Sequence, residues 1–400
     1  MFLDLIRRRN PRLIEAAIAL HQRGDLPANA YVIDLDAVES NARAISAKAD
    51  SLGLTVMAMT KQMGRNDSFC RAVMRGGIAR SVAVDMECAL ATKRAGMELG
   101  HIGHLVQIPR WDASKAARLS PAWWTVFNLE KAAEAAAASQ TLGRERKQPL
   151  LARIRGENDQ FYRGHEGGFP ASDVVAVAAA LDKLSGGRFA GITTFPALLF
   201  DAASRTVKPT PNLETLLQAS QTLARLGYKG IEINAPGTTS SVTLEALAEA
   251  GATQVEPGHG LTGTTPLHVT GDLPEKPAVV YLTEISHLSE GEAFCFGGGL
   301  YIDPVFPDYQ VKAIVGREPR TDAGALRAVE IPPPAAIDYY GMIDAAGPGK
   351  LEPGDSVVLG FRPQAFVTRA FVAGVSGLSR GKPAVESICH SSGAKADWPG

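Results

Sequence analysis

The 400-residue chain has the composition of an ordinary soluble globular protein: hydrophobic residues make up 45%, charged residues make up 21%, and the formal net charge is −1. These values exclude the strongly basic character of a nucleic-acid-binding protein. No stretch approaches the roughly 20 apolar residues of a membrane helix. The four cysteines are scattered with no CxxC pair, which argues against a disulfide framework and a structural zinc site. We therefore expect a cytoplasmic protein with no membrane partner.

A strand followed by a helix is predicted near the N-terminus, in the stretch YVIDLDAVESNARAISAKADSLG, which follows a first helical segment. From residue 54 to about residue 260, one pattern then repeats: a short apolar run, a turn and a helical segment. The apolar runs are TVMAMT (55–60), RSVAVD (80–85), HLVQI (104–108), WTVFN (124–128), LLARIR (150–155), GITTF (191–195), GIEIN (230–234) and TQVEP (253–257). Strands that alternate with helices indicate parallel pairing through crossover helices.

These eight units predict an α/β fold, a closed (β/α)8 barrel over residues 51–270, with a doubly wound open sheet as the alternative. Beyond the barrel, short runs divided by glycine and proline predict an all-β domain over residues 271–390 and a tail over residues 391–400. The first strand and helix lie within residues 1–50, and that strand can join the β domain.

Lys61 stands at the end of the first apolar run, where a charged ammonium is costly to bury unless it is paired or neutralised. A solvated lysine at a strand end is one interpretation. The other is a lysine held in a pocket, where a lowered pKa or a covalent bond makes it reactive. Barrel active sites lie at the carboxyl ends of the strands, which is the end that Lys61 occupies.

Two glycine turns follow the last two apolar runs. The seventh run leads into NAPGTTSS and the eighth into EPGHG. Backbone N–H groups at a helix start, together with threonine and serine hydroxyls, form a cradle for an anion, and barrels often bind phosphate between strands seven and eight. Ordinary strand–helix turns use the same residues, so both interpretations stay open, although two such turns side by side favour phosphate.

If the barrel closes, strand eight neighbours strand one and brings Glu256 near Lys61, beside the predicted phosphate cradle. A structural ion pair is one interpretation of these two residues. A lysine, an acid and a phosphate cradle are also what pyridoxal 5'-phosphate needs. The lysine amine forms an imine with the aldehyde, the acid keeps the pyridine nitrogen protonated, and the cradle holds the phosphate.

The chain resembles the alanine-racemase-like enzymes of fold type III, which use pyridoxal 5'-phosphate and include ornithine and diaminopimelate decarboxylases. The segments that carry the resemblance are YVIDLDAVESNARAI, VMAMTKQMG, GHEGGF, NAPGTTS, EPGHG, GMID and LEPGDSVVLG. The resemblance implies that Lys61 is the Schiff-base lysine. It also implies a head-to-tail homodimer in which the β domain of one subunit completes the active site of the other. The implied cofactor-binding residues are Lys61, Asn234, Gly237, Thr238, Thr239, Ser240, Glu256, Gly258 and His259.

The sequence departs from the family pattern at several positions. Glu256 stands where alanine racemases have an arginine and the decarboxylases have a glutamate, and His259 replaces an arginine that touches phosphate in the decarboxylases. Phe195 ends the sixth run, where the group often has a histidine against the ring. The decarboxylases use a Cys–Asp pair for their substrate, and the sequence has no such dipeptide, whereas FGGGLYID offers Tyr301 in place of the racemase tyrosine.

Racemisation needs one base on each face of the planar carbanion, so Lys61 and Tyr301 are the predicted catalytic pair. Tyr301 can equally pack against the barrel. Arg163 and Arg362 are candidates for a clamp on the substrate carboxylate, because arginine binds carboxylates bidentately. His165 is a further substrate-binding candidate or a turn residue.

Three functions remain open on the sequence. The first is a racemase or epimerase that removes the α-proton of a free amino acid. The second is a decarboxylase, which Glu256 favours and the missing Cys–Asp pair opposes. The third is a non-catalytic pyridoxal-phosphate carrier, which the β-rich segment opposes because such single-barrel proteins lack one. Related metal-dependent lyases use a His-x-Cys pair, whereas Cys389 and His390 are adjacent in the opposite order, so no metal is expected. One sequence does not identify the amino acid.

Overall fold

The computed structural model describes residues 1–143, 146–302, 310–346 and 349–398. The chain divides into two compact units, each formed by separate stretches of sequence. The barrel unit consists of Arg43–Thr60 and Gly77–Gly260, and the β unit consists of Met1–Ala42, Lys61–Gly76 and Leu261–Gly400. The domain boundaries expected at residues 50, 270 and 390 stay predictions.

A parallel sheet closes on itself in the barrel unit. Its strand order is β2-β13-β12-β9-β7-β6-β5-β4-β3, and β2 and β3 are two parts of one strand, separated only by Met57. β2 pairs with β13, and β3 pairs with β4, so the predicted (β/α)8 barrel is confirmed and the open sheet is excluded. The strands are β2 (Thr55–Val56), β3 (Ala58–Met59), β4 (Arg80–Ala83), β5 (Glu98–Ile102), β6 (Trp123–Val126), β7 (Gln148–Arg155), β9 (Gly187–Thr193), β12 (Glu232–Asn234) and β13 (Gln254–Val255).

The third strand lies earlier in the sequence than predicted. β5 covers Glu98–Ile102, whereas residues 104–108 contain no strand. Gly100 and His101 interrupt the apolar pattern of β5, so hydrophobicity pointed to the apolar run that follows. Gly100 is required by close packing, because a Cβ at this position would lie 2.7 Å from Sδ of Met57. His101 is a fully buried polar residue within the strand.

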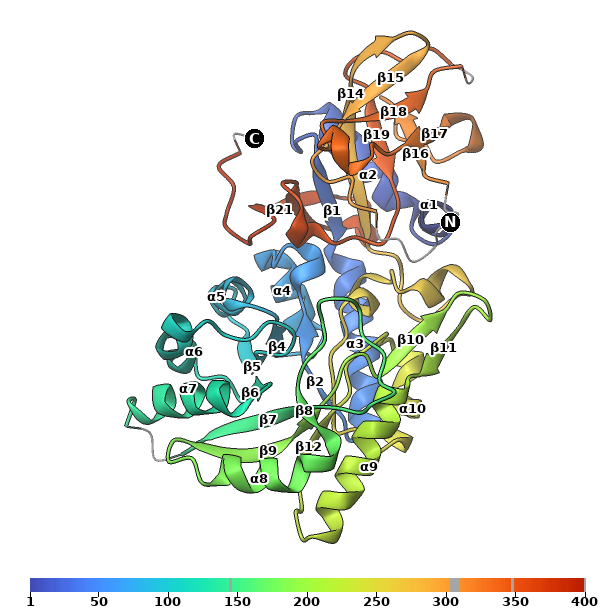
Figure 1. Cartoon of the computed structure of the whole chain (residues 1–400). Helices are drawn as coiled ribbons and strands as arrows, with labels where there is room; N and C mark the ends of the chain where they lie inside the picture. The colour runs from blue at the N-terminus through green and yellow to red at the C-terminus, as the bar shows by residue number, and fades with distance from the viewer. Residues whose placement is uncertain (144–145, 303–309, 347–348, 399–400) are drawn as a thin grey trace. The chain divides into compact units, whose positions relative to one another are not determined.

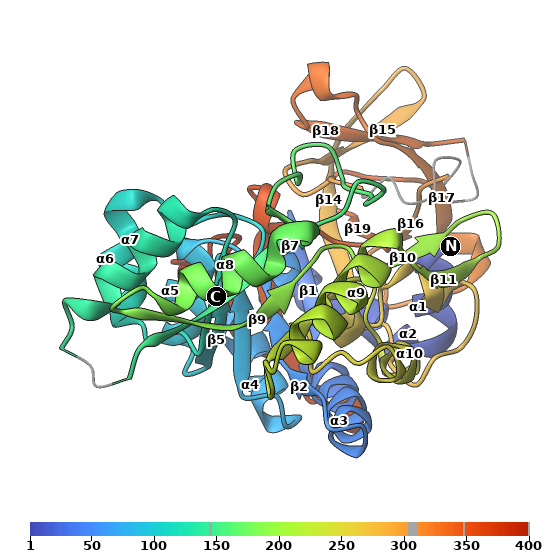
Figure 2. The same ribbon diagram turned by 60° about the horizontal axis from the view of Figure 1, so that its bottom comes forward.

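Six helices of the described chain lie wholly within the barrel unit (Figure 1 and Figure 2). Two of them begin with a side-chain cap: the Asp85 carboxylate accepts a 2.7 Å hydrogen bond from the Cys88 backbone N–H, and the Asn128 side chain accepts one from the Lys131 backbone N–H at 2.8 Å. The helices are α5 (Met86–Arg94), α6 (Ala113–Arg118), α7 (Leu129–Gln140), α8 (Val174–Asp182), α9 (Pro211–Arg225) and α10 (Leu244–Glu249). Two smaller elements accompany them: β8 (Phe169–Pro170), which pairs with β7, and the hairpin β10 (Leu198–Asp201) and β11 (Thr206–Pro209).

The β unit is built on a nine-stranded sheet with the order β15-β18-β17-β16-β19-β14-β1-β20-β21. All its pairings are antiparallel except the one between β1 and β20, which confirms the predicted all-β architecture after the barrel. Its strands are β1 (Ala30–Asp34), β14 (Val279–Ser289), β15 (Glu292–Phe296), β16 (Lys312–Gly316), β17 (Leu326–Glu330), β18 (Tyr340–Asp344), β19 (Ser356–Leu359), β20 (Phe371–Ser376) and β21 (Ala384–His390).

Two N-terminal helices, α1 (Phe2–Arg9) and α2 (Pro11–Gln22), bury their apolar faces in the core of the β unit. There Leu13 and Ile18 join a cluster with Val32 of β1 and Val280 of β14. The remaining long helices are α3 (Leu35–Ser51) and α4 (Asp67–Arg75). After β21 the chain folds back, and the backbone N–H of Ala396 donates to the carbonyl of Ile388. No helix among the described residues has both the length and the apolar character needed to cross a membrane.

Candidate active site

A buried carboxylate, Glu256, follows the last barrel strand and is held by three side chains. Nδ1 of His101 lies 2.6 Å from Oε1, and Nδ2 of Asn234 donates to the same oxygen at 3.0 Å. Nε2 of His104 lies 3.3 Å from Oε2. All four residues are buried, and they come from or follow the carboxyl ends of β5, β12 and β13, the end at which barrel active sites form.

A second layer of hydrogen bonds fixes the groups that hold Glu256. The other ring nitrogen of His101 lies 2.6 Å from the hydroxyl of Thr125 on β6. The hydroxyl of Thr193 on β9 donates to the side-chain carbonyl of Asn234 at 2.7 Å. The orientation of the carboxylate is therefore set by residues of four barrel strands, β5, β6, β9 and β12, which is the kind of preorganisation that catalytic sites require.

The charge of Glu256 follows from these neighbours. Burial by itself would raise the pKa of this carboxyl group, but His104 and His101 beside it, with the hydrogen bonds from His101 and Asn234, hold the pKa below its ordinary value. Glu256 is therefore ionised at neutral pH.

The two glycine turns predicted to hold phosphate pack directly against each other. A Cβ on Gly260, the last residue of the second turn, would lie 2.4 Å from the carbonyl oxygen of Thr239 in the first. Gly237 is equally constrained, since its Cβ would lie 2.6 Å from the backbone nitrogen of Leu198. Ser240 precedes the 3-10 turn Ser241–Thr243, which leads into α10, and His259 is buried. The structure thus places the predicted turns side by side at the barrel end.

Phe195 connects the Glu256 cluster to a second group of side chains at the same barrel end. Its ring centroid lies 5.7 Å from that of His104 and 6.0 Å from that of His165. The carbonyl of His165 accepts a 2.6 Å hydrogen bond from Arg153, a buried residue of β7. Arg163, by contrast, has a side chain that is 97% exposed and paired with Glu166, so the structure gives it no place in the barrel interior.

The other predicted residues belong to the β unit. Lys61 is half-buried and begins the 3-10 turn Lys61–Met63, two residues beyond the end of β3. Its Nζ lies 4.8 Å from the ring centroid of Phe366. Arg362 follows β19 and is half-buried, and Tyr301 is 48% exposed.

Sequence reasoning missed His101, His104 and Arg153. The predicted third strand covers residues 104–108. His101 therefore precedes that predicted strand and His104 lies within it, so neither follows a strand end. Arg153 lies inside the run LLARIR, and only residues after each run were considered. A polar residue within an otherwise apolar barrel strand was the signal available for both His101 and Arg153, since burying one requires a partner.

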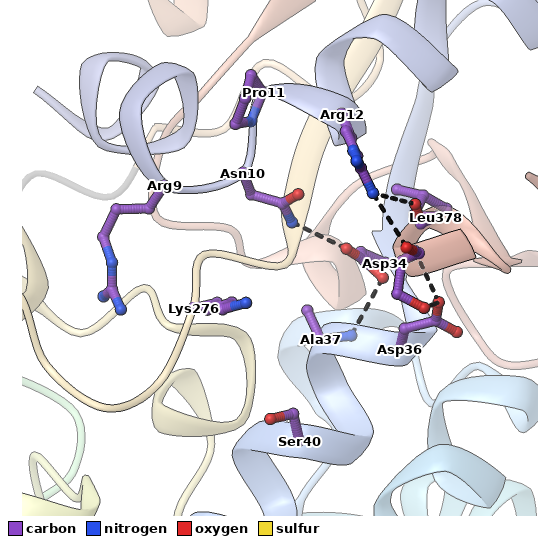
Figure 3. Close-up of a pocket in the computed structure, with 11 residues that line it drawn as sticks. Arg9, Asn10, Pro11, Arg12, Asp34, Asp36, Ala37, Ser40, Lys276 and Leu378 are labelled. Atoms are coloured by element: carbon purple, nitrogen blue, oxygen red, sulfur yellow. Dashed lines mark hydrogen bonds between the residues drawn. The ribbon is translucent and has the colours of Figure 1, made fainter. Parts of the chain in front are cut away.

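A separate cavity of about 460 Å³ lies within the β unit and contains none of the predicted site residues. Figure 3 shows its charged lining, in which Asn10 donates to the carboxylate of Asp34 at 2.9 Å. The same carboxylate accepts the backbone N–H of Ala37 at the start of α3. Burial raises the pKa of Asp34. These bonds give Asp34 a structural role in joining α3 to the N-terminal helices.

The closed barrel, the antiparallel β unit and the buried acid beside paired glycine turns define a pyridoxal-phosphate protein of the alanine racemase-like fold type III class. The family model "Alanine racemase, N-terminal domain" matches residues 33–266, and the chain belongs to this family. A second model, "YhfX-like, C-terminal domain", matches residues 280–385. The chain is 38% identical to uncharacterized protein YhfX of Escherichia coli (strain K12) over 400 residues, covering 98% of this chain and 100% of that protein.

Solved structures show the same fold at low sequence identity. D-threonine aldolase from Filomicrobium marinum is 18% identical with a TM-score of 0.68, over 92% of this chain and 96% of that one. D-threo-3-hydroxyaspartate dehydratase from Delftia sp. HT23 is 17% identical with a TM-score of 0.65, over 90% and 97%. Alanine racemase of Clostridium difficile 630 in complex with cycloserine is 15% identical with a TM-score of 0.61, over 92% and 99%.

The family binds pyridoxal 5'-phosphate, and the barrel residues fit this cofactor. Oε2 of Glu256 is buried and accepts no hydrogen bond from the described residues, although the His104 ring lies beside it. A protonated pyridine nitrogen would supply the donor that this oxygen lacks. The cofactor of the family is pyridoxal 5'-phosphate; Glu256 is the residue that would face its ring nitrogen, and the adjoining glycine turns would hold its phosphate.

The donor atoms of His101, His104 and Glu256 lie within 4.8 Å of one another, which is also the arrangement of a metal site. We nevertheless expect purified protein to contain less than stoichiometric metal, because both ring nitrogens of His101 already face hydrogen-bonding partners. Elemental analysis by mass spectrometry, before and after dialysis against EDTA, measures this. One equivalent of zinc or manganese that is lost in His101→Gln would contradict the expectation.

Proposed function

We propose that the chain is a pyridoxal-phosphate-dependent enzyme that removes the α-proton of a free amino acid, with racemase or epimerase activity. The observation that carries the proposal is the ionised, buried carboxylate of Glu256, whose free oxygen is directed by a fixed set of neighbours. When bound, pyridoxal 5'-phosphate withdraws electrons from the α-carbon of the attached amino acid. Glu256 would hold a proton at the ring nitrogen and so strengthen that withdrawal, and Lys61 would take the proton from the α-carbon.

Chain connectivity supports a joint role for these two residues. The backbone N–H of Met59 donates to the carbonyl of Pro257 at 2.9 Å. Pro257 directly follows Glu256, and Lys61 lies two residues beyond Met59. The strand that leads to the lysine is thus bonded to the segment that carries the acid.

Tyr301 is our proposed second base, acting on the opposite face of the α-carbon. Its exposure on the β unit supports a homodimer in which this tyrosine reaches the active site of the partner subunit. Racemisation by Lys61 and Tyr301 then requires the dimer, and dilution below its dissociation constant would lower specific activity.

A decarboxylase is the second candidate, and the same observation favours it, because a carboxylate on the ring nitrogen assists loss of CO2 as well as loss of a proton. The two activities differ in their products. Decarboxylation releases an amine and CO2, whereas racemisation returns the amino acid with the opposite configuration.

One experiment separates these functions. Protein loaded with pyridoxal 5'-phosphate is incubated in deuterated water with a panel of L- and D-amino acids that includes D-threonine, and the products are analysed by chiral chromatography and mass spectrometry. We expect deuterium at the α-carbon together with inversion. In Tyr301→Phe, we expect one enantiomer still to exchange while inversion falls about 100-fold or more, because the second face lacks its base. Deuterated amine would establish the decarboxylase, and an aldehyde with glycine would establish aldol cleavage. No exchange with any member of the panel would overturn the proposal.

A further inference from the structure

Arg153 is a buried cation that forms no ion pair with an acidic side chain among the residues that the structure describes. The residue is 1% exposed, and its Nη2 donates to the backbone carbonyls of His165 at 2.6 Å and Phe195 at 3.4 Å. Nε and Nη1 have no hydrogen-bond partner in the part of the chain that the structure describes. Two buried guanidinium nitrogens, which carry three N–H donors, are therefore available to an acceptor that the described residues do not provide.

The nearest candidate for a structural partner is already engaged. The carboxylate of Asp159 accepts the backbone N–H of Gly156 at 2.8 Å and the hydroxyl of Thr215 at 2.7 Å, and it forms no ion pair with Arg153 among the described residues. Its charge only offsets part of the effect of burial, which lowers the pKa of Arg153 to about 10. The guanidinium is therefore still positively charged at neutral pH.

The guanidinium lies at the barrel end that carries Glu256. Its central carbon lies 4.7 Å from the ring centroid of Phe127, just beyond β6, and the carbonyls that it contacts belong to residues beyond β7 and β9. Phe195 joins the two groups, because its carbonyl accepts from Arg153 while its ring contacts His104 of the Glu256 cluster. A cationic group and an anionic group thus occupy one rim, separated by an aromatic side chain.

We propose that Arg153 binds an anionic oxygen at the mouth of the barrel, and that this oxygen belongs to the α-carboxylate of the substrate. The assignment rests on the proposed function, since it needs an amino-acid substrate. An arginine that is buried, charged and incompletely bonded is suited to a carboxylate, because charge-assisted hydrogen bonds are the strong ones and the desolvation of the guanidinium is already complete. The phenolate oxygen of the cofactor offers the same chemistry and is the alternative source.

The test compares pairs of ligands that differ only in the carboxylate, such as alanine with ethylamine and serine with ethanolamine. Each is titrated into protein loaded with pyridoxal 5'-phosphate, and the apparent dissociation constant is read from the visible spectrum. The dissociation constant of the cofactor is measured separately by equilibrium dialysis. Arg153→Gln is compared with Arg155→Gln, an exposed arginine of the same strand, as the matched control.

We expect the wild-type protein to prefer the amino acid over its amine by about 10- to 100-fold, the value of hydrogen bonds to a charged group. Arg153→Gln should lose most of this preference and keep its cofactor affinity, Arg153→Lys should recover part of it, and Arg155→Gln should retain it all. A tenfold weaker hold on the cofactor, with the preference intact, would assign the oxygen to the cofactor and overturn the assignment to the substrate.

Equal binding of amino acid and amine by the wild-type protein would overturn the proposal without any variant, so it stays testable if Arg153→Gln does not fold. Spectra that respond to neither ligand class would instead count against the proposed function. In that case the equilibrium dialysis still tests the proposal for Arg153. An unchanged cofactor affinity in Arg153→Gln or Arg153→Lys would mean that Arg153 binds neither a substrate anion nor the cofactor, and would overturn the proposal.

Discussion

Lys61→Ala is expected to remove the visible absorption band of the bound cofactor and to lower the turnover of any substrate by at least roughly 10³-fold, the combined loss of an amine nucleophile and a proton-transfer group. Lys61 follows Thr60 at the end of the first barrel strand and is half-buried. An alanine at this position has no amine that could attach the cofactor and no base that could act on the α-carbon. Absorbance spectroscopy of dialysed protein and the deuterium-exchange assay measure the two losses.

Two further variants separate the effect of losing the amine of Lys61 from the effect of losing its positive charge. Lys61→Arg keeps a cation near Phe366 but cannot form the covalent attachment, so we expect it to behave like Lys61→Ala. Lys93→Ala removes an exposed lysine of α5 and should change neither measurement. A normal visible band in Lys61→Ala, together with cofactor that stays covalently bound after borohydride reduction, would show that another lysine attaches the cofactor.

Glu256→Gln is expected to lower turnover by about 10²- to 10³-fold, as the removal of one preorganised electrostatic group does in other enzymes. The substitution preserves the shape of the side chain but removes the negative charge that, in the proposed function, would keep a proton at the ring nitrogen. Steady-state kinetics measures the loss of turnover.

The matched control is Glu232→Gln on β12, whose carboxylate accepts the hydroxyl of Thr253 at 2.8 Å outside the cluster. It should retain wild-type turnover. Melting temperatures and circular dichroism of both variants separate loss of chemistry from loss of fold. Wild-type activity in Glu256→Gln would show that the ring nitrogen needs no proton in this enzyme, and would remove the observation on which the proposed function rests.

The barrel was predictable because seven of its strands are apolar runs at a regular spacing, and only closure was left to inference. β5 was misplaced for a physical reason. His101 hydrogen-bonds the carboxylate of Glu256, and Gly100 leaves room for the side chain of Met57. Both features lower the apolar content that marks a strand, so the prediction moved to the more hydrophobic loop. At this strand, the polar residue that the Glu256 cluster requires lowers the hydrophobicity by which a strand is recognised in the sequence.

Glu256 and the glycine turns were predictable because each directly follows a strand. The surroundings of the arginines were not predictable, because one sequence does not show that Arg163 is exposed and paired with Glu166 whereas Arg153 is buried. The role of Arg163 stays a prediction. Tyr301 and Arg362 stay predictions, since their roles depend on the partner subunit that the proposed dimer would supply.

Because β1 lies between β14 and β20, the β unit cannot be completed before the barrel unit, although its first strand is synthesised before the barrel. Ala30 pairs with Leu282 on one side and with Phe371 on the other, so the ribosome makes this central strand first and both of its neighbours last. The barrel unit, ending at Gly260, is fully synthesised before either neighbour exists. Domains generally fold as they emerge from the ribosome. Here β1 emerges early but cannot pair until β14 and β20 have been synthesised. A fragment beginning at residue 271 would lack β1 and expose the edges of β14 and β20, the kind of unpaired edge that promotes aggregation.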